Sequence, residues 1–124
     1  MDDFIRIFNF IDDASKPGRM ISSVKIGDVY MTRVIIKPGV ITGNYYHTDT
    51  RMMFYVGNAP VKAAFEQVKT GERQEMVLEP GKQAVHIPEY VALATQNLGN
   101  VDAVLVFFSN RPLRSDDNVE YKVL

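Results

Sequence analysis

The sequence predicts an all-β protein, built as a sandwich or barrel of many short strands. Short runs rich in Val, Ile, Phe, Tyr and Thr recur along the whole chain, and Gly, Pro, Asn and Asp separate them. The periodicity of amphipathic helices is almost absent. With 124 residues, 46% of them hydrophobic, the chain is long enough to bury one sizeable core, so we expect a single domain over residues 1–124.

Turn-forming sequences set the ends of the expected strands. Runs such as Lys37-Pro38-Gly39 and Glu79-Pro80-Gly81 supply the constrained or positive φ angles that turns need. The segments between such turns are predicted to be strands, in chain order Phe4–Ile11, Met20–Ile26, Val29–Ile36, Ile41–His47, Met52–Val56, Val61–Val68, Gln74–Leu78, Ala84–Ile87, Val91–Asn97, Val104–Ser109 and Val119–Val123.

The segment from Val61 to Val68 also fits a helix. Its apolar residues Val61, Ala64, Phe65 and Val68 follow the i, i+3, i+4, i+7 spacing of a helical face. We favour a strand because the run is short and ends at a plausible hairpin turn, after which residues 74–78 offer a partner strand.

Composition and charge exclude several classes of protein. Lys and Arg number 14 against 15 Asp and Glu, and no basic cluster with interleaved aromatics occurs, so we expect no nucleic-acid partner. The absence of Cys excludes disulfides, cysteine zinc sites and thiol nucleophiles. An acidic beginning is unlike a signal peptide, and no apolar run approaches the roughly 18 residues of a membrane span. We therefore expect no membrane partner and a cytoplasmic location.

The most unusual stretch is Gly43-Asn44-Tyr45-Tyr46-His47, which concentrates polar aromatic side chains in one predicted strand. Because side chains alternate along a strand, Gly43, Tyr45 and His47 are expected on one face, and Asn44 and Tyr46 on the other. A phenol and an imidazole are then presented side by side, with Gly43 leaving room for a close approach.

The spacing of this region resembles the first motif of the cupin superfamily. That motif runs Gly, five residues, His, one residue, His, three or four residues, Glu, six residues, Gly. Laid on this chain, Gly39 and His47 match, whereas Tyr45, Met52 and Ala59 replace the first histidine, the glutamate and the last glycine.

The second cupin motif is matched in part by residues 88–97. Pro88 and Asn97 match, while Tyr90 replaces a glycine and Leu93 replaces a histidine. The region around Gly43–His47 and the ending Val106–Ser109 look most like the cupins of capsular-polysaccharide and nucleotide-sugar biosynthesis. The resemblance implies an all-β, cupin-type jelly-roll barrel (a double-stranded β-helix).

The resemblance also implies where a cupin metal would bind, namely at positions 45, 47, 52 and 93. Only His47 keeps a family ligand there. Tyr45 could ligate only as a phenolate, and Met52 and Leu93 offer no hard donor. We therefore expect no metal and no other cofactor.

Some cupins that modify sugars work without a metal, using a histidine as general base beside a tyrosine. The resemblance therefore suggests a metal-independent sugar-processing protein, with His47 as base and Tyr45 as its proton-transfer partner, acting on or binding a nucleotide-linked or polysaccharide-precursor sugar by epimerase- or ketoisomerase-like chemistry. The alternative is a catalytically silent cupin that binds a small ligand or a protein partner. In that case Tyr45 fills the space of the lost metal and His47 is a hydrogen-bonded core residue.

Further residues are candidates for contact with a bound sugar or nucleotide sugar. Arg33 interrupts an apolar strand, so it either faces solvent or reaches into the barrel to bind an anion. Met52 is better suited to the core or a pocket wall than to ligation, and His86 is either structural or part of the pocket. The expected ligand-binding set is Arg33, Asn44, Met52, His86, Leu93 and Asn97.

The first predicted strand suggests a homodimer. Phe4, Ile5, Ile7, Phe8 and Phe10 make it more apolar than a lone exposed sheet edge tolerates. Cupins similar to this one commonly pair through such strands.

Overall fold

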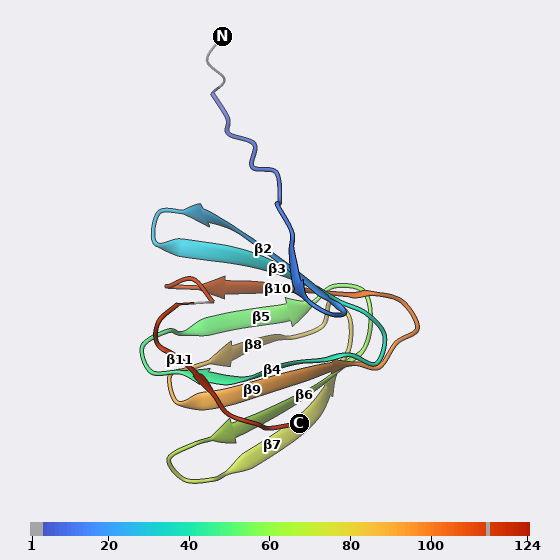
Figure 1. Cartoon of the computed structure of the whole chain (residues 1–124), viewed down its shortest axis with the longest axis vertical. Coiled ribbons are helices and arrows are strands. Elements are labelled where there is room, and N and C mark those ends of the chain that lie inside the picture. The colour runs from blue at the N-terminus through green and yellow to red at the C-terminus, as the bar shows by residue number, and fades with distance from the viewer. Residues whose placement is uncertain (1–3, 114) are drawn as a thin grey trace.

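The computed structural model describes residues 4–113 and 115–124, which form two antiparallel β-sheets packed on each other (Figure 1). The first sheet has the strand order β1-β2-β3-β10-β5-β8 and the second has the order β11-β4-β9-β6-β7. These residues contain no helix, so the all-β prediction is confirmed. The strands are β1 (Asp13–Lys16), β2 (Arg19–Ile26), β3 (Val29–Ile36), β4 (Ile41–His47), β5 (Met52–Val56), β6 (Val61–Gln67), β7 (Arg73–Leu78), β8 (Ala84–Ile87), β9 (Val91–Asn97), β10 (Ala103–Ser109) and β11 (Asn118–Glu120).

The main core lies between the two sheets and follows the alternation of the strands. In β5, Met52, Phe54 and Val56 are buried while the residues between them are exposed. Phe54 stacks on Phe107 of the neighbouring β10, with 4.9 Å between ring centroids. The apolar side chains of one face of each sheet are thus removed from water by the other sheet.

A second, smaller cluster lies on the opposite face of β9. Ala64, Ala92 and Ala94 are buried there under Val123 from the C-terminal segment, which crosses this face. Small side chains at these three positions let the segment lie close to the sheet. Coverage on both faces explains why β9 is buried along nearly its whole length.

The predicted strands agree with the structure except at the two ends of the chain. The strand predicted at Phe4–Ile11 is wrong, because these residues form no strand and a short unpredicted strand follows at Asp13–Lys16. The last strand is Asn118–Glu120 rather than Val119–Val123. The ambiguous segment is a strand, Val61–Gln67, paired with β7 and β9 on its two sides.

Within the residues that the structure describes, no helix is both long and apolar enough to cross a membrane.

Candidate functional site

A cavity of about 660 Å³ opens between the two sheets, where β1 and β2 of one sheet approach β4 and β11 of the other. Both polar and apolar side chains line it. Its lining comprises the charged residues Lys16, Arg19, Glu120 and Lys122, the polar residues Thr42, Asn44, Tyr45, Thr95, Ser115, Asn118 and Tyr121, the apolar residues Ile21, Val34, Leu93, Phe107 and Leu113, and Gly43. Three cations and one carboxylate therefore surround a space large enough for a small ligand.

A β-bulge in β4 shapes one side of this cavity. Gly43 lies opposite Ala94 and Tyr45 lies opposite Leu93, so Asn44 is the extra residue. Asn44 has a φ of 60° and Gly43 a φ of 95°. The bulge interrupts the simple alternation expected for this strand. All three of Gly43, Asn44 and Tyr45 line the cavity, and Gly43 lies close to the backbone of β9.

Asn44 fastens the C-terminal segment to this bulge. Its side-chain oxygen accepts hydrogen bonds from the backbone N–H groups of Val123 and Leu124 at 2.7 and 3.0 Å, and its backbone carbonyl accepts one from the N–H of Tyr121 at 2.9 Å. Tyr121 and Lys122 line the cavity. The predicted ligand-binding residue Asn44 therefore lines the cavity and also holds part of its wall in place.

Tyr45 and His47 lie side by side, as the sequence predicts. Their rings meet edge to face with 5.1 Å between centroids. The Tyr45 hydroxyl points to the sulfur of Met52 at 3.9 Å, a weak contact. Burial raises the pKa of Tyr45, and the nearby Arg19 offsets this only in part. The phenol is therefore neutral at physiological pH.

His47 is 2% exposed and does not line the cavity. Its Nε2 lies 3.0 Å from the carbonyl oxygen of Leu113, to which Nε2–H donates in the neutral ring. Its Nδ1 is buried and has no hydrogen-bond partner among the described residues. Burial lowers the pKa of His47; the Leu113 carbonyl and the Asp117 carboxylate offset that effect in part. The imidazole is thus a neutral interior group rather than a base exposed to a ligand.

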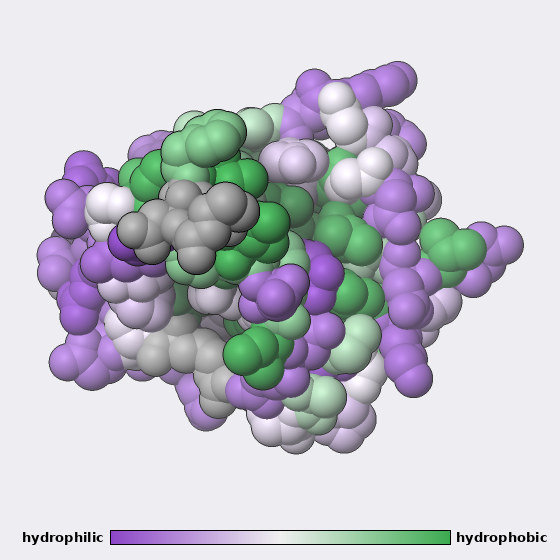
Figure 2. All heavy atoms as spheres, turned by 90° about the horizontal axis from the view of Figure 1, so that it is seen from above, coloured by the Kyte–Doolittle hydropathy of each residue, from purple (hydrophilic) through white to green (hydrophobic). Residues whose placement is uncertain are grey.

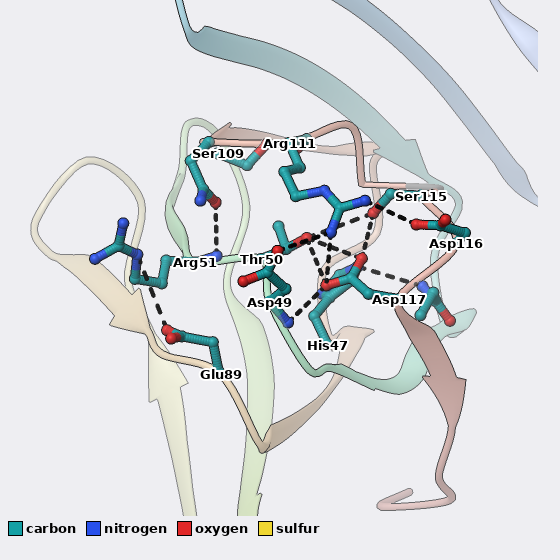
Figure 3. Close-up of polar contacts among 12 residues, drawn as sticks. His47, Asp49, Thr50, Arg51, Glu89, Ser109, Arg111, Ser115, Asp116 and Asp117 are labelled. Carbon is teal, nitrogen blue, oxygen red and sulfur yellow. Dashed lines mark hydrogen bonds and ion pairs between the residues drawn. The ribbon is translucent and has the colours of Figure 1, made fainter.

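A polar network connects the loop after β4 to the segment before β11 (Figure 3). The side chain of Asp117 is 6% exposed, and it accepts hydrogen bonds from the Thr50 hydroxyl at 2.9 Å and from the backbone N–H of Asp49 at 2.8 Å. Arg111 forms ion pairs with Asp49 at 3.0 Å and Asp116 at 2.7 Å. This network holds the described residues between β10 and β11, 110–113 and 115–117, of which Leu113 and Ser115 line the cavity.

The pKa of Asp117 reflects these contacts. Desolvation acts to raise it, but hydrogen bonds from Ser115, the Asp49 N–H and Thr50, together with His47, outweigh that effect and lower the pKa to about 2. Asp117 is therefore ionised at neutral pH and serves as the charged centre of the network.

The other predicted ligand-binding residues are distributed over the molecule. Leu93 lines the cavity, whereas Met52 does not; the Met52 sulfur lies 3.9 Å from the Tyr45 hydroxyl. His86 is an exposed residue of β8, away from the cavity. Arg33 does not line the cavity either: it is paired with Asp12 at 2.7 Å and lies over the ring of Phe10.

Asn97 is buried and fully engaged by the backbone. Its amide nitrogen donates to the carbonyls of Ile36 and Val101 at 2.9 and 2.8 Å, and its oxygen accepts from the N–H of Gly99 at 2.8 Å. Asn97 thus fixes the turn between β9 and β10 and leaves no atom for a ligand.

Several cavity residues were not predicted from the sequence. Lys16, Arg19, Glu120 and Lys122 lie near strand ends and in the tail, where charged residues normally face solvent. The packing of the two sheets and the return of the C-terminal segment past β4 bring them together, and no local sequence pattern carries that information.

The residues present do not fit a cupin-type metal. Of the four expected ligand positions, position 45 holds a neutral phenol, position 52 a thioether and position 93 a hydrocarbon. Across residues 4–113 and 115–124, no group of three or more His, Cys, Asp or Glu side chains is placed to hold a metal ion.

Comparison with known proteins identifies the fold. No family model and no curated protein matches the chain. Among solved structures, the capsular polysaccharide assembling protein CapF from Staphylococcus aureus aligns with a TM-score of 0.83 at 24% identity, over 98% of this chain and 33% of CapF. The chain therefore spans about a third of the length of CapF.

Two further neighbours have the same architecture. Recombinant oxalate oxidase in complex with glycolate aligns with a TM-score of 0.76 at 18% identity, over 97% of this chain and 65% of that one. Lactobacillus farciminis oxalate decarboxylase aligns with a TM-score of 0.77 at 13% identity, over 90% of this chain and 33% of that one. These likenesses confirm the cupin-type jelly-roll fold.

Proposed function

We propose that this cupin-fold chain binds a nucleotide-linked or polysaccharide-precursor sugar in the cavity between its sheets, and that binding rather than proton transfer is its activity. The observation that carries the proposal is the chemistry of the lining. Lys16, Arg19 and Lys122 are cations suited to phosphate oxygens, and the rings of Tyr45 and Tyr121 are suited to the C–H faces of a sugar.

Hydroxyl groups complete a surface that suits a sugar. The hydroxyls of Thr42 and Thr95 lie 2.9 Å apart in the cavity wall and can each donate or accept. Asn118 and Glu120 add an amide and a carboxylate. The fold likeness to a capsular polysaccharide assembling protein supports a saccharide as the ligand.

The position of His47 favours binding over catalysis. A general base must reach the proton that it removes, directly or through one water. His47 is buried outside the cavity lining, and a backbone carbonyl holds its Nε2. Tyr45 is neutral and its hydroxyl is directed at the Met52 sulfur, so it is no base either.

Isothermal titration calorimetry with UDP-glucose, UDP, glucose and glucose 1-phosphate tests this proposal. We expect binding of a phosphate-bearing probe, weakened about tenfold by Lys122→Gln because a charge-assisted hydrogen bond is lost. Lys82→Gln is the matched control, since Lys82 is an exposed loop residue outside the cavity. Equal affinity in both variants would contradict the assignment of the cavity.

The catalytic alternative is tested with the probe that binds. Incubation in D2O followed by proton NMR detects exchange at the carbon atoms of the sugar ring. We expect no deuterium incorporation, and we expect His47→Asn to retain the affinity of the wild type. Exchange that the wild type catalyses and that His47→Asn abolishes would instead establish the proton-transfer function.

A further inference from the structure

A second hollow, of about 200 Å³, lies next to the cavity. Ile21 and Leu113 line both spaces. The other residues that line the second hollow are Ile11, Asp13, Ser22, Ser23 and Pro112. The N-terminal arm, residues 4–11, extends away from both sheets (Figure 1), and because Ile11 is part of the lining, the hollow lies at the base of this arm. A space of this size is enough for one sugar ring.

The hairpin of β1 and β2 leads from the cavity to the second hollow. Along β2, Arg19 lines the cavity, Ile21 lines both spaces and Ser23 lines the second hollow. On the neighbouring β1, Lys16 lines the cavity and Asp13 lines the second hollow. The two strands pair with Lys16 opposite Arg19 and Asp13 opposite Ile21, so both lead in the same direction.

The residues between β10 and β11 follow the same path. Ser115 lines the cavity, Leu113 lines both spaces and Pro112 lines the second hollow. Because the residues of a strand rise about 3.3 Å each, about 13 Å separates Arg19 from Ser23 along β2. The two spaces are therefore successive parts of one groove, which is long enough for a phosphate group followed by two sugar rings.

The two parts of this groove differ in charge. The cations Lys16 and Arg19 line the cavity, whereas no Lys or Arg among the described residues lines the second hollow. The second hollow instead offers the carboxylate of Asp13 and the hydroxyls of Ser22 and Ser23, next to apolar side chains. Carboxylate and hydroxyl groups bind sugar hydroxyls, and apolar side chains suit the C–H faces of a sugar ring. Figure 2 views the molecule from the side of the arm and shows hydrophilic and hydrophobic side chains next to each other on this face.

We infer that the ligand is a saccharide phosphate of at least two sugar units, an inference that rests on the proposed function. The phosphate group binds to the cations of the cavity, and the sugar farther from the phosphate occupies the second hollow. A phosphate that carries a single sugar fills the cavity alone and makes no contact with Asp13 or Ser23. The second hollow therefore selects for the length of the saccharide, and the cavity selects for the phosphate.

Calorimetric titration of the unmodified chain with glucose 1-phosphate and maltose 1-phosphate tests this inference, because the two probes differ by one glucose unit. We expect about tenfold tighter binding of maltose 1-phosphate, since the additional sugar gains hydrogen bonds and apolar contacts. Binding of glucose 1-phosphate or UDP-glucose without any gain for maltose 1-phosphate would overturn this inference and leave the proposed function standing. If none of these three probes bound, both would be overturned.

Ser23→Phe tests the place of the second sugar, because it puts a ring into the second hollow. Ser23 is exposed, and its hydroxyl lies 2.7 Å from the hydroxyl of Thr32. We expect this variant to bind glucose 1-phosphate as the wild type does and to lose the tenfold preference for maltose 1-phosphate. Ser15→Phe is the matched control, since Ser15 is exposed on β1 and lines neither space, and circular dichroism checks that both variants fold. A preference that Ser23→Phe retains, or that Ser15→Phe also loses, would overturn the inference.

Discussion

Gly43 lies where β4 passes so close to β9 that no side chain fits. A Cβ atom there would lie 2.7 Å from the carbonyl oxygen of Leu93 and 3.1 Å from the Cα of Ala94, and both of these are backbone atoms of a central strand. The φ of Gly43 is also positive, at +95°, a region that side chains rarely adopt. Both the lack of space for a side chain and the positive φ therefore favour glycine at this position.

We expect Gly43→Ala to destabilise the fold by about 2 to 4 kcal/mol, because the backbone strain and the clash add. Gly39→Ala is the control: Gly39 also has a positive φ, +79°, but nothing lies within 4 Å of its Cβ position, so about 1 kcal/mol is expected. Urea unfolding followed by circular dichroism measures both. Equal losses would show that the approach to β9 has no energetic consequence.

The sequence predicted the pairing of Tyr45 with His47 but not the environment of either ring. Alternation along a strand brings residues two apart to the same face, and the two rings do meet. The bulge at Gly43 and Asn44 shifts the register of β4 against β9, and a bulge depends on the neighbouring strand. The carbonyl that holds His47 comes from Leu113, which lies 66 residues away in the sequence. Strand periodicity carries no information on such a partner.

At the scale of elements, residues 110–113 and 115–117 belong to no strand and are held by polar and charged side chains. Their contacts to the 47–51 loop centre on the carboxylate of Asp117 and the guanidinium of Arg111. Adjacent acidic residues such as Asp116 and Asp117 normally face water. Asp117 instead lies inside the network with its oxygens occupied by Thr50, Ser115 and Asp49.

The stability of this segment should depend on pH. The pKa of Asp117 is about 2 in the folded protein, against an ordinary value of 3.8. A lowered carboxyl pKa stabilises the fold above the ordinary value, and that contribution is lost as the pH falls from about 4 to about 2. The pKa of His47 is lowered by burial, so its protonation also opposes folding as the pH falls below the ordinary value of 6.5.

Asp117→Asn separates these two effects. At pH 7 we expect it to cost about 1 to 2 kcal/mol in unfolding free energy, and we expect the difference from wild type to disappear near pH 2. Urea unfolding at pH values from 2 to 8 measures this difference in unfolding free energy between the variant and the wild type. Asp116→Asn is the control, because the Asp116 side chain is 90% exposed. A difference that stays constant across this range would contradict the role of the ionised carboxylate.

The ends of the chain show where strand prediction fails for a physical reason. Residues 4–11 have the composition of a strand, and composition indicates only that a segment suits a sheet. It does not show that a partner strand exists within the same chain. The interior strands were predictable because turns on both sides constrain them, whereas the pairing of a terminal segment depends on surfaces formed by the whole fold.

At the scale of the whole molecule, the cavity is assembled from both ends of the chain and from the middle strands. β1, β2, β4, β9, β11 and the C-terminal segment all contribute to it. Fold class could be derived from local patterns, because each strand is a local property. The cations of the cavity could not, because their proximity results from the packing of two sheets.

The packing between the two sheets also predicts that the thermal stability of the protein does not depend on a metal ion. Tyr45, Met52 and Leu93 fill the positions where the cupin resemblance implies ligands, and the buried side chains around them are held by apolar contact. We expect dialysis against EDTA to leave the melting temperature unchanged, and addition of Mn²⁺, Ni²⁺ or Zn²⁺ not to raise it, because a ligand that binds the folded state would stabilise it. Differential scanning calorimetry measures both, and elemental analysis of the purified protein is the control. A rise of several degrees with one metal, at equimolar concentration and lost in His47→Ala, would show that the fold retains a metal site.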